Sequence, residues 1–128
     1  MSMRLIRFGF TALFIFFASS AHAATLSLTA SSVSPRVGDD IILRVMVDTQ
    51  GVAINALEGI VRFDTARFEG LSTSKSASFL TIWMEGPSID NTAGTIRFSG
   101  GVPNPGFIGI GEVFSATMRA RGAGSRRR

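Results

Sequence analysis

Residues 41–47 (IILRVMV) and residues 57–63 (LEGIVRF) decide the fold that the sequence predicts. In both stretches one set of alternate positions is uniformly apolar, while the other set includes charged residues. A period of two is typical of a β-strand that buries one face and exposes the other. The set expected to face inward is Leu43, Val45, Val47, Leu57, Val61 and Phe63.

Further stretches of the same kind lie on either side of these two. They are expected to be further strands, at residues 25–29, 79–84, 95–99 and 113–120. Gly86-Pro87 is expected to end the strand before it, and residues 100–111, with five glycines and two prolines, are expected to be a long loop. No helical pattern follows the N-terminal segment. The sequence therefore predicts an all-β fold, a jelly-roll-type β-sandwich of about seven short strands.

The first 23 residues have the three parts of an export signal. Two arginines precede an apolar run at residues 8–18, and residues 21–23 (AHA) give the small-x-small pattern of a cleavage site. We expect cleavage between Ala23 and Ala24. A retained anchor is the alternative, but a spanning helix needs roughly 20 apolar residues and this run is shorter. The sequence thus predicts a cleaved signal peptide, only transient membrane contact, and a secreted or cell-surface protein.

Removal of residues 1–23 would leave a β-sandwich at residues 24–124 and a basic tail at residues 125–128. The chain has 13 Lys and Arg against 9 Asp and Glu, and two of the arginines would leave with the signal. The net charge would then be about +2, and three arginines of the tail supply more than all of it. We therefore expect no nucleic-acid surface.

The amino-acid composition excludes several kinds of catalytic site. The chain has no Cys and no Tyr, and its one His, His22, lies in the predicted signal. Zinc sites and Ser-His-Asp triads are thereby excluded after cleavage. A carboxylate-based hydrolase stays open because nine acidic residues remain, but their placement does not favour it. We expect a binding protein without enzymatic activity and without a cofactor. A structural or adhesive surface protein is an alternative.

Four segments resemble parts of a cohesin domain. SVSPRVGDDIILRVMVDT (residues 32–49) resembles its opening turn and strand, and INALEGIVRFDTARFEG (54–70) resembles the strand that ends in an aromatic-Asp-Pro turn, with Thr65 in place of the proline. AGTIRFSGG (93–101) and GEVFSATMRARGAG (111–124) resemble its later strands. The order and spacing of these segments, from Leu26 to Gly124, carry the resemblance.

This resemblance implies a sandwich related to carbohydrate-binding modules. It also implies a dockerin-type protein partner in assemblies of polysaccharide-degrading enzymes. A cohesin domain continues with two more strands, and its last strand pairs with its first. We therefore expect a truncated or frame-shifted product in which residues 25–29 lie at an open sheet edge.

The candidate partner-binding residues are Glu58, Ile60, Arg62, Arg97 and Ser99. By resemblance, the strand of the first three lies on the dockerin-binding face, and the other two would lie beside it. An ordinary solvent-facing strand is the alternative interpretation. An outward-facing isoleucine among charges nevertheless suits the centre of an interface.

Two further sets of residues have a functional and a structural interpretation. Trp83 could contact polysaccharide, but a single Trp is more typical of a partly buried core or rim position. Asp39, Asp40, Asp90 and Asn91 carry oxygens that could bind calcium. They lie in predicted turns, where Asp and Asn bond the backbone. We therefore expect no dedicated metal site.

Overall fold

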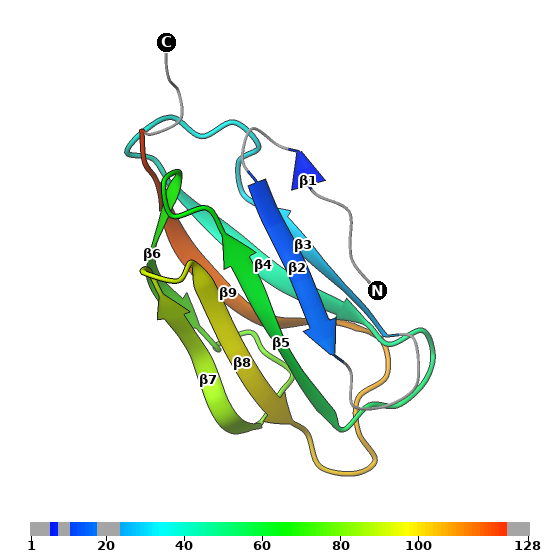
Figure 1. Cartoon of the computed structure of the whole chain (residues 1–128). Helices are drawn as coiled ribbons and strands as arrows, with labels where there is room; N and C mark the ends of the chain where they lie inside the picture. Colours follow the sequence, from blue (N-terminus) through cyan, green and yellow to red (C-terminus); the bar gives the residue numbers. More distant parts are fainter. Residues whose placement is uncertain (1–5, 8–10, 18–23, 123–128) are drawn as a thin grey trace.

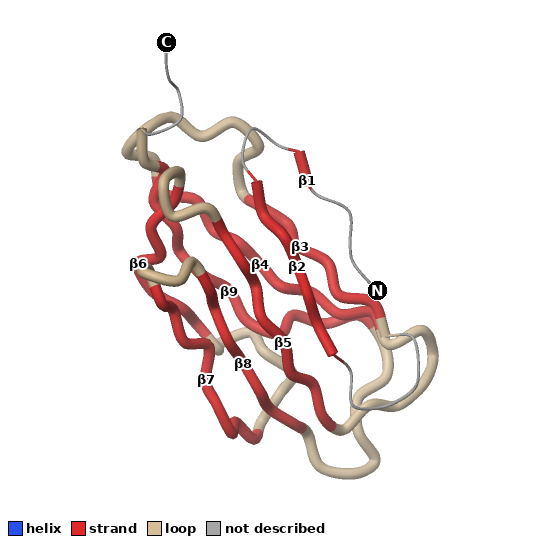
Figure 2. The backbone as a smooth tube through the Cα atoms, viewed as in Figure 1, coloured by secondary structure: helices blue, strands red, loops and turns tan. Residues whose placement is uncertain are grey.

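Two antiparallel β-sheets pack face to face, and Figures 1 and 2 show them as two layers. The computed structural model describes the backbone of residues 6–7, 11–17 and 24–122, and the side chains of residues 24–122. These residues form strands, turns and loops without a helix. The all-β sandwich predicted from the alternating sequence is thereby confirmed.

One layer, the β4–β9 sheet, has the strand order β3-β4-β9-β6. The other layer, the β5–β8 sheet, has the order β1-β2-β5-β8-β7. The chain changes sheet after β2, β4, β5, β6 and β8. The bounds are β1 Ile6–Arg7, β2 Thr11–Phe17, β3 Thr25–Ala30, β4 Asp40–Asp48, β5 Ala56–Phe63, β6 Phe68–Ser74, β7 Ile82–Asp90, β8 Thr95–Gly101 and β9 Ile110–Ala120.

The core lies between the sheets and comes from the alternate apolar positions of the strands. Phe98 of β8 and Phe114 of β9 meet across the two layers, with ring centroids 5.2 Å apart. The pairing of β4 with β9 shifts between Val45 and Met46, so Val113 is an extra residue in β9. A bulge of this kind turns two successive side chains to the same face, and Val113 and Phe114 are both fully buried.

The predicted strand at residues 79–84 is wrong in its bounds. The strand is Ile82–Asp90, and it continues through Gly86-Pro87 instead of ending there. Proline is tolerated in an edge strand because its missing N–H can face away from the ladder. β7 lies at the edge of its sheet, and its pairing with β8 shifts on both sides of Glu85.

Two other predictions need correction. The predicted loop at residues 100–111 is shorter, because β8 extends to Gly101 and β9 already begins at Ile110. β6 was not predicted, because Phe68–Ser74 has no regular alternation and buries little beyond Phe68 and Gly70. It nevertheless pairs with β9 along most of its length.

β2 belongs to the segment predicted to be the export signal. It pairs antiparallel with β5, from Ala12 opposite Phe63 to Phe17 opposite Glu58. Of the predicted cleavage site, Ala23 lies outside the described residues, as do residues 125–128 of the basic tail. Ala24 is described, and it is 5% exposed.

Candidate functional site

Strand register brings the predicted partner-binding residues together on the outer face of the β5–β8 sheet. Glu58 lies opposite Ser99, and Ile60 lies opposite Arg97. Arg62 follows on the same face of β5, opposite Thr95 rather than a charged neighbour. The alternation of β5 produces this arrangement, because Leu57, Gly59 and Val61 all face the core.

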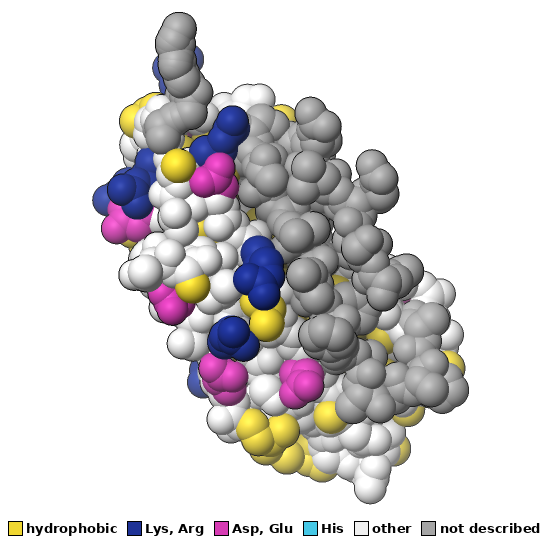
Figure 3. All heavy atoms as spheres, viewed as in Figure 1, with side chains coloured by type: hydrophobic (Ala, Val, Ile, Leu, Met, Phe, Trp, Pro, Cys, Tyr) yellow, Lys and Arg dark blue, Asp and Glu magenta, His cyan; other side chains and the backbone are white. Residues whose placement is uncertain are grey.

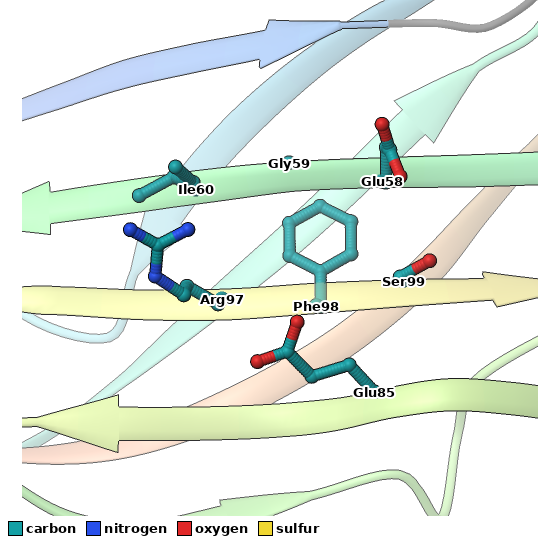
Figure 4. Close-up of a pocket in the computed structure, with 7 residues that line it drawn as sticks. All are labelled: Glu58, Gly59, Ile60, Glu85, Arg97, Phe98 and Ser99. Atoms are coloured by element: carbon teal, nitrogen blue, oxygen red, sulfur yellow. The ribbon is translucent and has the colours of Figure 1, made fainter.

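A hollow of about 250 Å³ lies on this face, lined by Glu58, Gly59, Ile60, Glu85, Arg97, Phe98 and Ser99. Ser99 lies between two acidic residues, since it is opposite Glu58 on one side and opposite Glu85 on the other. Figure 4 shows the Arg97 guanidinium pointing toward Ile60, with Glu58 and Glu85 on the strands that flank β8. We refer to Glu58, Ile60, Glu85, Arg97 and Ser99 as the hollow residues.

Glu85 is the hollow residue that sequence reasoning missed. It lies only two residues before Pro87, in a stretch where the sequence predicts the end of a strand. The irregular pairing of β7 with β8 places it opposite Ser99. That register depends on shifts within an edge strand, and local periodicity contains no signal for them.

The charged residues in and beside the hollow form no ion pairs with one another. Glu58, Arg62, Glu85 and Arg97 take part in none of the ion pairs within residues 24–122. Figure 3, which looks onto this face, shows basic, acidic and hydrophobic side chains next to one another over β5, β8 and β7. Both signs of charge are therefore available to a molecule that covers this surface.

Apolar surface continues the hollow toward the start of β7. A second, smaller hollow of about 150 Å³ is lined by Ala56, Leu57, Glu58, Met84, Ser99 and Gly100. Met84 is 68% exposed, and Ile82 on the same strand is also exposed. Methionine is flexible and polarizable, and it is enriched at protein interfaces.

Trp83 is partly buried, as expected for a core or rim residue. It packs against the hydrophobic core, and its ring lies over Gly100 of the neighbouring strand. The Lys75 ammonium group lies 5.4 Å from the ring centroid. A sugar-stacking platform needs an accessible ring face, and here Gly100 and Lys75 both lie close to the ring.

The four candidate calcium ligands are engaged in local structure. Asp39 accepts a hydrogen bond from the backbone N–H of Arg36, and Asp40 pairs with Arg119. Asp90 accepts hydrogen bonds from two N–H groups of its own turn. Asn91 both accepts from and donates to the backbone of Gly70. Asp39, Asp90 and Asn91 thus bond backbone groups, as Asp and Asn in turns commonly do. Asp40 instead lies in β4 and pairs with a side chain.

The hollow residues can bind by charge, hydrogen bonding and apolar contact. Glu58 and Glu85 are both exposed. Both carboxylates can therefore accept hydrogen bonds from a molecule that covers this face.

Comparison with known proteins gives this chain no relative: no protein-family profile, curated protein or solved structure matches it. Within residues 6–7, 11–17 and 24–122, no group of three or more His, Cys, Asp and Glu is arranged to hold a metal ion. The same residues include no helix long and apolar enough to cross a membrane.

Proposed function

We propose that this chain is an exported, non-catalytic recognition module that resembles cohesin and binds a dockerin-type protein partner. The binding surface would be the outer face of the β5–β8 sheet. The observation that carries this proposal is the set of charges around Ile60 that form no ion pair within residues 24–122, with exposed Met84 beside them. Arg97 and Ser99 would supply donors, and the two glutamates would supply acceptors.

The energetic argument rests on what an interface does to such residues. A partner that covers Ile60 removes apolar surface from water, at about 25 cal/mol for each Å². The surrounding charges would contribute through complementary partner charges, which also select the partner and orient it. The β-sheet beneath is held by ladder hydrogen bonds, so little ordering cost is expected on binding.

Polysaccharide binding is the alternative from a different class. It would depend on Trp83, which is partly buried and has Lys75 near its ring. The position of this ring favours a protein partner over a sugar chain. The two proposals make opposite predictions for Ile60→Asp and Trp83→Ala.

The test is binding of the exported protein to purified dockerin modules, measured by isothermal titration calorimetry, with retention on insoluble cellulose measured in parallel. Ile60→Asp places a charge at the centre of the surface and should weaken protein binding by at least about 30-fold, as a central interface residue would. The matched control is Ile42→Asp, because Ile42 is an exposed isoleucine on the outer face of the other sheet, whereas Ile60 is half-buried.

Protein binding that is lost in Ile60→Asp and kept in Ile42→Asp would support the proposal. Retention on cellulose that is lost in Trp83→Ala would support the polysaccharide alternative instead. If dockerin modules bind both isoleucine variants as well as the unaltered protein, this face is not the binding surface.

A further inference from the structure

The edge of β5 that faces β2 is a site where the protein accepts a strand. Six consecutive residues of β2 pair with β5 in the described structure, from Ala12 to Phe17. These six residues lie within the segment that the sequence predicts to be removed on export. Removal would expose the backbone groups of β5 along this edge, and an exposed row of N–H and C=O groups is a template for another strand.

The backbone groups exposed on this edge belong to Glu58, Ile60 and Arg62. The N–H of Phe63 donates to Gly94 on the β8 side, and the carbonyl of Asn55 accepts from Val102 on that same side. Alternate residues of a strand direct their N–H and C=O groups to opposite sides. The odd-numbered residues of β5 therefore bond to β8, and the even-numbered ones face the edge.

The sequence of β5 is complementary to itself when two copies run antiparallel. With Ile60 opposite its own counterpart, Glu58 of each copy lies opposite Arg62 of the other. On the inner side, Leu57 lies opposite Phe63 and Gly59 opposite Val61, so every facing pair there is apolar. Opposite charges that face each other across an antiparallel pair stabilise it, at a Cβ separation of about 5 Å.

Other registers lose this match. Moving the centre from Ile60 to Gly59 places Glu58 opposite Ile60, and moving it to Val61 places Glu58 opposite Asp64. The first removes the charge pair, and the second brings two acidic residues together. All three registers place even-numbered residues opposite one another, so each facing pair of edge residues exchanges two backbone hydrogen bonds in any of them. Charge therefore selects the register centred on Ile60.

We infer that a second copy of this chain occupies the β5 edge once residues 1–23 are removed, forming a symmetric dimer with one continuous sheet. This inference rests on the predicted removal of the signal, not on the identity of any partner. Side chains of a strand project from the faces of its sheet, so the hollow residues of both copies would lie on one side of the joined sheet. Before export, β2 occupies the edge and prevents this pairing.

The experiment uses the full chain expressed in a host that exports it, with the N-terminal residue of the product read by mass spectrometry. A product that begins at Ala24 should have twice the mass of one copy in sedimentation velocity. Glu58→Arg alone and Arg62→Glu alone each place like charges opposite each other twice, and each should weaken the dimer about tenfold or more. The variant with both substitutions should dimerise as the unaltered chain does.

The decisive arm mixes the two single variants. In a mixed pair, every basic residue at these positions again faces an acidic one, so two weakly associating proteins should form a heterodimer. Arg97→Glu is the matched control, because this charge lies on β8, away from the edge, and its variant should remain dimeric. Its expected loss of partner binding separates the proposed function from this inference.

Three results would overturn the inference. A product that keeps residues 1–23 has an occupied edge, and an exported product that stays monomeric at high concentration does not use the edge. A dimer that all the charge variants form equally well uses another surface, such as the β3 edge of the β4–β9 sheet.

Discussion

The outer faces of the two sheets carry similar residue types but arrange their charges differently. On the β4–β9 sheet, Arg44 pairs with Glu112 at 3.1 Å, and Asp40 pairs with Arg119 at 3.0 Å. On the β5–β8 sheet, the charged residues of the hollow form no such pair within residues 24–122. The named charges on the β4–β9 face are thus paired with one another. Within the described side chains, those on the β5–β8 face stay free to contact a partner. This contrast is the physical basis for placing recognition on the β5–β8 sheet.

The largest expected effect on stability comes from a substitution in the core between the two sheets. Phe114→Ala removes a fully buried ring that contacts Phe98 of the opposite sheet. We expect a loss of about 3–5 kcal/mol in the free energy of unfolding, because the cavity cannot be filled by neighbours already at close packing. Urea denaturation followed by circular dichroism measures this loss. A cost no larger than that of Ile42→Ala, on an exposed face, would contradict the described core.

The hairpins of the two sheets differ in how tightly they enclose a glycine. Gly94 has φ +72° at the β7–β8 turn, and an added Cβ there would meet the carbonyl oxygen of Phe63. Gly38 has φ +90° before β4, with open space around it. Gly94→Ala should cost about 3 kcal/mol in unfolding free energy, and Gly38→Ala about 1 kcal/mol. Equal costs, measured by thermal denaturation, would show that crowding adds nothing to the backbone effect.

Asn91 joins the edges of the two sheets. Its side-chain amide bonds the N–H of Gly70 at 2.8 Å and the carbonyl of Gly70 at 2.9 Å, where the pairing of β6 with β9 is irregular. Asn91→Ala should cost about 1–2 kcal/mol, because two partly buried backbone groups lose their partner. Asn104→Ala, in the exposed loop before β9, is the control. Hydrogen exchange at Gly70 should accelerate in the first variant and stay unchanged in the second.

The smallest expected effect tests the charge contrast itself. Arg44→Met should lower the free energy of unfolding by about 1 kcal/mol or less, since Glu112 keeps only 12% of its side chain exposed and loses its ion pair. The loss should shrink in high salt. Arg97→Met should leave the stability unchanged, because Arg97 forms no ion pair within residues 24–122. A greater loss of unfolding free energy in Arg97→Met than in Arg44→Met would contradict the difference in ion pairing between the two faces.

The sequence predicted the strands whose two faces differ in polarity. β3, β4 and β5 were predicted to within one or two residues because their alternate positions are apolar throughout. β7 was misplaced because Pro87 ends most strands but is tolerated at an edge. The bulge at Val113 also left no local signal, since Val113 and Phe114 are adjacent in sequence and both face inward.

The candidate site was predicted in part, for the same reason. Glu58 and Ile60 follow from the alternation of β5, and their facing residues Arg97 and Ser99 follow from a regular β8. Glu85 and Met84 depend on how an irregular edge strand pairs with β8, which is decided by tertiary packing. Long-range pairing of this kind is weakly encoded in any single segment.

Trp83 gives the protein an intrinsic fluorescence signal from a known position in the fold. The chain has one Trp and no Tyr, so its near-ultraviolet fluorescence arises almost entirely from a single ring. That ring lies over Gly100, which lines the smaller hollow together with Met84. A ligand that alters the packing of this ring changes its fluorescence, so binding at this end of the sheet can be followed without an attached dye. The same signal distinguishes docking on the β5–β8 sheet from docking on the opposite face, where no indole lies.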